Sequence, residues 1–255
     1  MPGEGKMAEW PEELDPLREA LRQPEEATEL DLGGSRSEEG PLAKAGLTEV
    51  PASIGRLTNV KWLDLRHNDL TELPESIGRL ANLKMLDLRQ NALTELPESI
   101  GRLANLKILK LGGKGGNALT ELPASIGRLA NLKRLNLRQN ALTELPESIG
   151  RLANLEELVL RWNALTELPA SIGQLANLKR LDLGHNDLTE LPESIGRLAN
   201  LEELDLRRND LTELPESVEN LSNLRQLDLR DNPLSPGVAD LLRLELPHDT
   251  SILSP

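Results

Sequence analysis

The stretch LTELPESIGRLANLKMLDLRQNA at residues 70–92 decides the fold of this chain, because it returns with few changes from Leu142, Leu165 and Leu188. A fixed short period is typical of an elongated solenoid, in which each unit packs on its neighbours. One asparagine per unit aligns the repeats. These residues are Asn68, Asn91, Asn117, Asn140, Asn163, Asn186, Asn209 and Asn232. Successive asparagines are 23 residues apart, except that 26 residues separate Asn91 from Asn117.

Each unit predicts one short strand and one turn. In Asp87-Leu88-Arg89 the leucine points inward and its polar neighbours point outward, which is the alternation of a strand. A proline such as Pro74 then ends the pairing, and the spacing of Ile77 and Leu80 suits a helical or 3₁₀ turn on the opposite side. We expect the strands of successive units to form one parallel sheet. The asparagines should turn inward and satisfy backbone groups at the corner after each strand.

The pattern L-x-x-L-x-L-x-x-N, followed by x-L-x-x-L-P-x-x-I-x-x-L, resembles the leucine-rich repeat of the 23-residue bacterial and intracellular subtype over about residues 27–234. This resemblance implies an α/β repeat solenoid, curved like a horseshoe. Its parallel sheet lies on the concave side, its 3₁₀ or short helical turns lie on the convex side, and helical caps close both ends. The chain is similar to the repeat regions of bacterial Roco proteins and of plant intracellular Ras-group-related repeat proteins. That likeness implies a small GTPase or another signalling protein as a partner.

The sequence divides into three segments. Residues 1–26 predict an N-terminal cap, with a helix over 11–22 that buries Leu14, Leu17 and Leu21 above Trp10. Residues 27–234 predict about nine repeats, the first of which carries an inserted loop at 35–45. The extra residues at Gly112–Gly116 should bulge at the rim of the sheet. Residues 235–255 predict a closing helix over 238–244 and, after Pro247, a weakly ordered tail.

The composition indicates in which cell compartment the protein resides and which classes of partner it can bind. A net charge of −13 argues against nucleic acid, which requires a basic face. The absence of cysteine favours a reducing compartment, and the N-terminus has no apolar signal region, so we expect a cytoplasmic protein. No apolar run is long enough for a membrane span. We expect a monomer that contacts neither a membrane nor nucleic acid.

Catalysis finds little support among these residues. The chain has no cysteine nucleophile, and Ser76 recurs in equivalent units as a structural residue would. His67 and His185 stand five units apart, about 24 Å by the spacing of strands, so they share no metal ion. Lys114 lies among glycines but opens no helix, unlike the lysine of a phosphate-binding loop. We therefore expect no enzyme activity, no cofactor and no metal. Two alternatives stay open: a substrate-recruiting or regulatory part of a larger enzyme (GTPase, kinase or ubiquitin ligase), and a secreted host-directed effector.

The outward strand positions vary from unit to unit, so packing does not dictate them. Trp62, Met85 and Ile108 should form an apolar stripe, and Val159 and Trp162 a second apolar spot flanked by arginines. Exposed tryptophan beside arginine is typical of binding hot spots, although drift on a tolerant surface gives the same pattern. We predict a protein or peptide partner with apolar anchors and mixed charge. The predicted contact residues are Trp62, Met85, Ile108, Lys110, Arg134, Arg138, Val159, Arg161, Trp162, Arg180 and His185.

Overall fold

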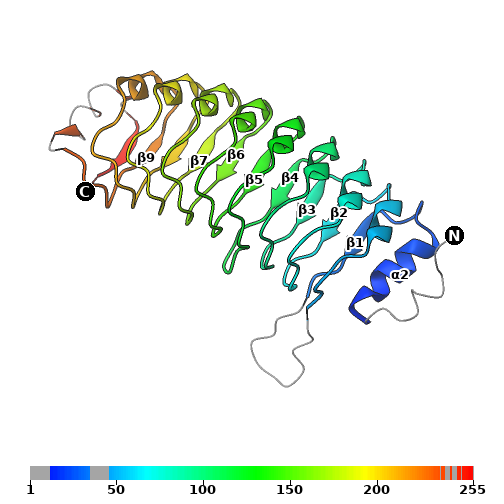
Figure 1. The fold of residues 1–255 in the computed structure, drawn as a ribbon. Coiled ribbons are helices and arrows are strands. Elements are labelled where there is room, and N and C mark those ends of the chain that lie inside the picture. The colour runs from blue at the N-terminus through cyan, green and yellow to red at the C-terminus, as the bar shows by residue number, and fades with distance from the viewer. Residues whose placement is uncertain are drawn as a thin grey trace.

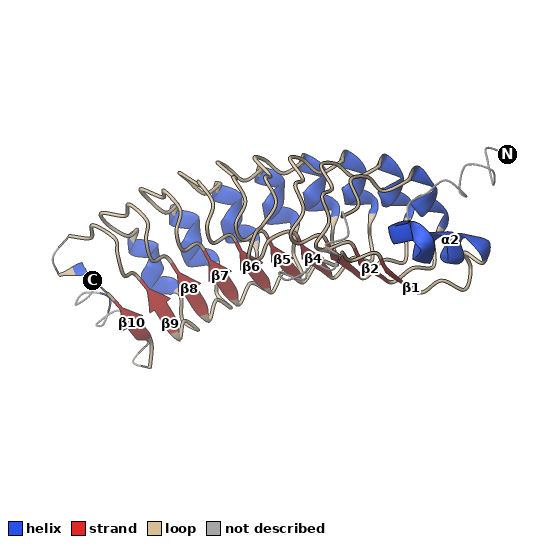
Figure 2. Cartoon of the chain, turned by 90° about the horizontal axis from the view of Figure 1, so that it is seen from below, coloured by secondary structure: helices blue, strands red, loops and turns tan. Residues whose placement is uncertain are grey.

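The computed structural model describes residues 12–34, 46–235, 237–238, 242, 246–247 and 249–254. Within them, one parallel sheet of ten strands runs along the whole molecule in sequence order (Figure 1). The strands are β1 Glu29–Asp31, β2 Trp62–Asp64, β3 Met85–Asp87, β4 Ile108–Lys110, β5 Arg134–Asn136, β6 Glu157–Val159, β7 Arg180–Asp182, β8 Glu203–Asp205, β9 Gln226–Asp228 and β10 Ser251–Leu253. Figure 2 shows these strands on the inner side of a curved array, so the predicted solenoid is confirmed.

Equivalent residues of successive units are direct neighbours in the sheet. Trp62 pairs with Met85, and Met85 pairs with Ile108. The same register continues through Arg134 to Glu157. Side chains at one repeat position therefore form a column that crosses the sheet at right angles to the strands.

On the outer side of the curve, a 3₁₀ turn follows Val50-Pro51 and the Leu-Pro step of each later unit up to Leu214-Pro215 (Figure 2). In the unit of residues 70–92, the amide of Ile77 donates to the Pro74 carbonyl at 2.9 Å and the amide of Leu80 donates to the Ile77 carbonyl at 3.1 Å. This i→i+3 pattern confirms the predicted turn. The turns are η2 Ala52–Arg56, η3 Glu75–Arg79, η4 Glu98–Arg102, η5 Ala124–Arg128, η6 Glu147–Arg151, η7 Ala170–Gln174, η8 Glu193–Arg197 and η9 Glu216–Asn220.

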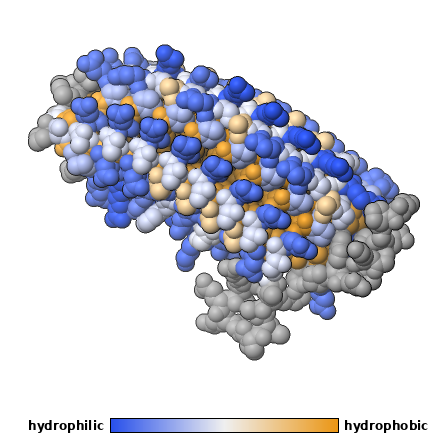
Figure 3. Space-filling model, in the orientation of Figure 1, coloured by the Kyte–Doolittle hydropathy of each residue, from blue (hydrophilic) through white to orange (hydrophobic). Residues whose placement is uncertain are grey.

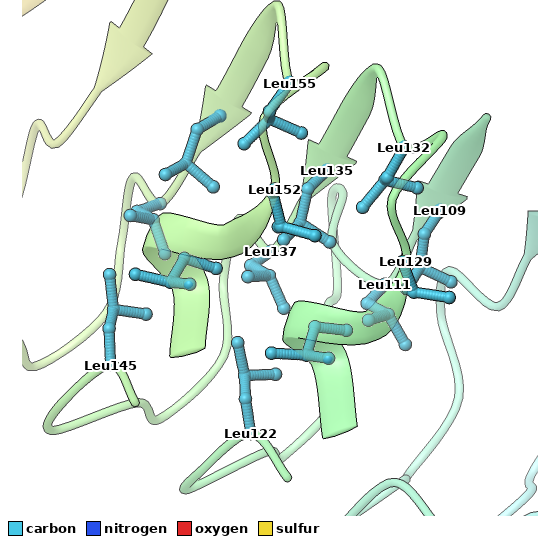
Figure 4. Close-up of a cluster of buried hydrophobic side chains, with 14 of the residues drawn as sticks. Leu109, Leu111, Leu122, Leu129, Leu132, Leu135, Leu137, Leu145, Leu152 and Leu155 are labelled. Atoms are coloured by element: carbon cyan, nitrogen blue, oxygen red, sulfur yellow. The ribbon is translucent and has the colours of Figure 1, made fainter. Parts of the chain in front are cut away.

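The core is a column of leucine and isoleucine between the sheet and the turns. In Figure 4, Leu135 and Leu137 from the β5 unit, Leu129 after η5 and Leu152 after η6 point into the same interior. All four have no exposed surface. Burying one such side chain contributes about 1.5–3 kcal/mol, so the array is stabilised by many equal increments rather than by one centre.

The inward asparagines connect neighbouring units. Asn91 accepts a hydrogen bond from the Leu70 amide at 3.1 Å. Its amide group donates to the carbonyls of Leu65 and Leu88 at 2.9 and 3.1 Å. Each bond satisfies a backbone group that the short strands leave unpaired, so the predicted structural role is confirmed.

The three extra residues near Gly112 are accommodated without breaking this asparagine column. Asn117 still accepts from the Leu93 amide at 3.0 Å and donates to the Leu111 carbonyl at 2.7 Å. Two glycines are required on steric or conformational grounds: Gly115 has φ +75°, and a Cβ on Gly116 would lie 1.6 Å from the Gln139 carbonyl oxygen.

At the N-terminal end, the turn η1 Glu12–Leu14 leads into the helix α2 Asp15–Arg22. This helix packs against β1 and η2 and buries Leu17 and Leu21. The predicted burial of Leu14, Leu17 and Leu21 agrees with their exposure of 4% or less. Trp10 and the loop at 35–45 lie outside the described residues.

At the C-terminal end the prediction of a weakly ordered tail is wrong. β10 pairs in parallel with β9, and Thr250 Oγ1 donates to the Leu224 carbonyl at 2.6 Å. Ile252 packs against the core. The added strand satisfies the edge of the sheet, since the Leu229 amide donates to the Leu253 carbonyl at 2.6 Å. Of the predicted closing helix, Val238 and Leu242 are described and both are helical.

Candidate interaction site on the strand face

Two tryptophans stand out on the concave strand face. Trp62 is 52% exposed and Trp162 is 41% exposed, and among the described residues they are the large hydrophobic side chains left to solvent. Seen from the side of Figure 1, rows of hydrophilic residues run along the array with hydrophobic residues between them (Figure 3). A solvent-exposed tryptophan on the strand face is a candidate anchor for a partner.

The first apolar stripe lies across β2, β3 and β4. Trp62, Met85 and Ile108 are neighbours in one column, and the last two are half-buried. Charged residues border the stripe: Arg89 Nη2 lies 2.6 Å from Asp87 Oδ2, and Lys110 Nζ lies 3.8 Å from the same oxygen. The structure thus brings together four predicted contact residues on three adjacent strands.

Val159 does not contribute to an exposed spot as the sequence predicted. It is 8% exposed, and it shares its column with Asp87 and Asp182, which are also buried. Several members of this column lie at the floor of the face, and in four strands an arginine two residues further along folds back onto the aspartate. Arg89, for example, donates to both carboxylate oxygens of Asp87. Val159 is therefore part of the floor rather than a contact surface.

Trp162 occupies a left-handed backbone position, with φ +62°. Its ring stacks on His185 of the next unit, with centroids 3.7 Å apart and an interplanar angle of 18°. The guanidinium carbon of Arg161 lies 5.8 Å from the centre of the tryptophan ring. These three side chains were all predicted contact residues, and they form one cluster. Ring stacking and the cation–π contact of the Arg161 guanidinium hold the cluster together.

His185 is neutral in this cluster. Arg161 Nη2 lies 2.8 Å from His185 Nε2, and an arginine can only donate, so Nε2 accepts and the ring proton sits on Nδ1. Burial lowers the pKa of His185, and the positive charges of Arg161, Arg208 and Arg138 lower it further.

A pocket of about 390 Å³ opens beside the cluster. Arginine dominates its wall, and the one carboxylate in the wall is paired: Arg208 Nε lies 3.0 Å from Asp231 Oδ2. The lining residues are Arg161, Trp162, His185, Arg207, Arg208, Arg230 and Asp231. The sequence prediction did not include Arg207, Arg208, Arg230 and Asp231 among the contact residues.

Carboxylates of three adjacent strands lie beneath this end of the face. Asp182, Asp205 and Asp228 are direct neighbours in the sheet. Burial and the negative charges of the other two raise the pKa of Asp205 to about 7, although Arg161 and Arg230 oppose the rise. Burial likewise raises the pKa of Asp182. The acidic groups are thus covered, and the guanidinium groups face outward.

The remaining predicted residues stand between the two tryptophans. Arg134 Nε lies 3.7 Å from Glu157, and Arg180 Nη1 lies 3.1 Å from Glu203. Arg138 is exposed, and its side chain forms no ion pair with any residue that the structure describes. By strand spacing the two tryptophans are about 20 Å apart, which is the reach of an extended segment of about six residues.

Within the described parts of the chain, no group of three or more histidine, cysteine, aspartate or glutamate side chains is placed to hold a metal ion. No helix of those parts is long and apolar enough to cross a membrane.

Comparison with known proteins identifies the repeat. A family model of the leucine-rich repeat region matches residues 48–137, 121–188 and 171–247. No curated protein sequence matches the chain significantly. A leucine-rich repeat protein of Leptospira interrogans is 26% identical over 92% of this chain and 98% of its own, with a TM-score of 0.45.

Plant receptors are among the similar solved structures. The leucine-rich repeat ectodomain of the membrane receptor kinase GASSHO1/SCHENGEN3 from Arabidopsis thaliana, in complex with CASPARIAN STRIP INTEGRITY FACTOR 2, is 32% identical over 81% of this chain, with a TM-score of 0.68. The plant peptide hormone receptor RGFR1 in complex with RGF2 is 29% identical over 81% of this chain, with a TM-score of 0.59. The chain spans 25% of the first receptor chain and 38% of the second.

Proposed function

This chain belongs to the leucine-rich repeat family, and we propose that it is a non-catalytic interaction module that binds a protein or peptide on its concave strand face. The observation that carries the proposal is the exposure of Trp62 and Trp162 on one face, where they are the exposed large hydrophobic side chains among the described residues. A free protein gains nothing from exposed indole rings, whereas a partner that covers them gains their full burial. The two plant receptors, each solved in complex with a second component, support the same use of the fold.

The finer identity of the partner is also a proposal. We expect a small GTPase or another signalling protein, met in the cytoplasm, because the repeat resembles those of bacterial Roco proteins and the chain contains no cysteine. A monomer leaves the whole strand face open to such a partner. Cell fractionation tests the location: recovery from the culture supernatant would favour a secreted effector instead. Because the chain spans only part of the receptors that it resembles, the role of a recruiting segment in a larger enzyme remains the alternative.

The test compares partner capture by variants of the two anchors. The parent protein and the double variant Trp62→Ala/Trp162→Ala are immobilised, and proteins retained from a lysate of the source organism are identified by mass spectrometry. A protein retained by the parent but not by the double variant is the candidate partner. We then measure the affinity of the parent and of each single variant for that protein. Each substitution should weaken binding about tenfold or more, as hot-spot tryptophans do.

The control is Arg128→Ala on the outer side of the array, which should leave the affinity unchanged. Because both tryptophans are exposed, the thermal melts of the variants should match the parent melt. If no retained protein discriminates the parent from the double variant, the strand face is not the binding surface and the proposal is wrong.

A further inference from the structure

The strand face changes charge along its length. In β2, β3, β8 and β9 an aspartate at the strand end pairs with an arginine two residues later. The Arg–Asp distances are 2.9 Å for Asp64 and Arg66, 2.6 Å for Asp87 and Arg89, 3.0 Å for Asp205 and Arg207, and 2.6 Å for Asp228 and Arg230. These pairs neutralise both ends of the face.

The central units lack the acidic partner. In β5 and β6 the aspartate is replaced by Asn136 and Val159, but the arginines Arg138 and Arg161 remain. In β4 the same column holds Lys110. The middle of the face therefore carries a cluster of cations without an aspartate in their own strands, although the whole chain has a net charge of −13.

Arg161 is held in a fixed position that leaves part of its donor capacity unused. It contacts His185 through Nη2 at 2.8 Å and approaches Asp205 through Nη1 at 3.8 Å. Its Nε is buried and forms no hydrogen bond with any described residue. Arg138, in the preceding unit, is exposed. An anion that entered here would meet one guanidinium held by its neighbours and one exposed guanidinium, and both could donate charge-assisted hydrogen bonds.

The pocket beside Trp162 extends the same chemistry. Arg207, Arg208 and Arg230 line it with Arg161. Asp205 and Asp228, the partners of Arg207 and Arg230, lie on the floor of the face, whereas Asp231, the partner of Arg208, lies in the pocket wall. The stacked rings of Trp162 and His185 supply an apolar wall. A short side chain that ends in a carboxylate or phosphate can place the anion against the guanidinium groups while its aliphatic part contacts the rings.

We propose that Arg138, Arg161 and the pocket beside Trp162 select an acidic segment of the partner protein, in which a carboxylate or phosphate lies close to an apolar side chain. This inference rests on the proposed function, since it names the chemistry of a partner on the same face. It replaces the mixed-charge partner expected from the sequence with an anionic one at the centre of the array. The net charge of the chain acts against long polyanions such as nucleic acid and favours a short acidic segment.

The experiment is a selection from a random library of displayed extended peptides. The library is selected separately on the parent, on Arg138→Gln/Arg161→Gln and on the control pair Arg128→Gln/Arg151→Gln, which removes the same charge from exposed positions on the outer turns. We expect aspartate and glutamate to be enriched beside an apolar residue on the parent and on the control pair, but not on the site pair. A synthetic peptide from the enriched set should lose about tenfold in affinity for the site pair, as loss of a charge-assisted bond predicts.

Further arms separate the sources of the anion and guard against misfolding. The glutamine version of the peptide tests the carboxylate, and a phosphoserine version tests phosphate. Arg138→Gln alone involves an exposed side chain, so its effect on binding does not depend on folding of the cluster. Vesicles of anionic lipid and a single-stranded oligonucleotide are offered as competitors. If either displaces the peptide at comparable charge concentration, the assignment to a protein segment is overturned.

The two proposals can fail separately. Recovery of peptides that need Trp62 and Trp162 but show no acidic enrichment would overturn this inference and leave the interaction function standing. An equal loss of binding on the control pair would also overturn it, because the effect would then be one of overall charge. If the parent retains no peptide or protein that depends on the two tryptophans, the proposed function itself is wrong.

Discussion

Replacing Asn186 with alanine tests whether the inward asparagines hold the units together. Asn186 is 6% exposed. It accepts a hydrogen bond from the Leu165 amide at 3.1 Å and donates to the carbonyls of Leu160 and Leu183 at 3.1 and 2.8 Å. The bonds to Leu165 and Leu160 cross to the preceding unit, and the bond to Leu183 stays within its own. The substitution Asn186→Ala removes all three and leaves one amide and two carbonyls without that partner.

The expected loss of unfolding free energy follows from the cost of leaving buried polar groups without a hydrogen bond. Each unsatisfied group costs about 1–3 kcal/mol. A carbonyl keeps its second lone pair, and water can enter the space left by the side chain, so we take the lower end of that range for each group. The free energy of unfolding should therefore fall by about 3 kcal/mol.

Asn177 supplies the matched control within the same unit. It is exposed, and its amide makes one hydrogen bond, to the Ala153 carbonyl at 2.8 Å. The substitution Asn177→Ala should cost only about 0.5–1 kcal/mol. Both variants change the same residue type and leave the net charge unaltered.

The assay combines urea unfolding with amide hydrogen exchange. Urea titrations followed by circular dichroism give the difference in unfolding free energy, and exchange reports whether the loss is local to the Leu165 amide. Exchange matters because an array of repeats can open unit by unit. If Asn186→Ala costs no more than Asn177→Ala, the asparagine column does not stabilise the array and our account of the repeat is wrong.

Three further predictions concern the pH response, the inserted loop and the last strand. Because the pKa of Asp205 is raised to about 7, the folded chain holds a proton that the unfolded chain releases above about pH 4, so stability should fall as pH rises towards 8. Asp205→Asn should match the parent melt only below about pH 4 and exceed its stability by on the order of 1 kcal/mol at pH 8, after allowance for partial exposure; exposed Asp210→Asn, the control, should show no such difference. Gly116→Ala places a methyl against the Gln139 carbonyl and should cost about 1–3 kcal/mol in urea unfolding; a cost near zero would mean that the loop moves freely. Truncation after Pro247 removes β10 and should lower the melting temperature and increase light scattering, since the edge of β9 is then unpaired; an unchanged melt would contradict the pairing.

The sequence predicted the framework well because one residue type repeats at each buried position. A leucine such as Leu88 and an asparagine such as Asn91 each meet the same surroundings in every unit, so the period alone fixes strand, turn and register. β10 escaped prediction because Ser251–Leu253 forms a single strand outside the period, with no asparagine after it. A strand of three residues gives too short an alternation to recognise alone.

The site was only partly predictable because outward columns differ in depth. Alternation along β6 says that Val159 faces the strand side, but it does not say that neighbouring arginine side chains close over that column. The exposure of Trp62 and Trp162 was predicted correctly because both stand where large side chains cannot fold back into the array. Arg207 and Arg208 were missed because their part in the pocket depends on the reach of a side chain two units away.

The position of Arg161 shows how one missing side chain changes the face. In β7 the unit has Gly184 where neighbouring units have arginine, so Asp182 has no arginine of its own strand. Arg161 extends across this gap to His185 and towards Asp205, two units away. A side chain at position 184 would stand in that path, since a Cβ there lies 3.1 Å from Asp205 Oδ1 and 3.3 Å from Arg207 Cγ. The cationic middle of the face and the Trp162 pocket beside it therefore coincide with three single-position departures, at Asn136, Val159 and Gly184, which change the pairing of guanidinium groups and carboxylates while the leucine framework stays constant.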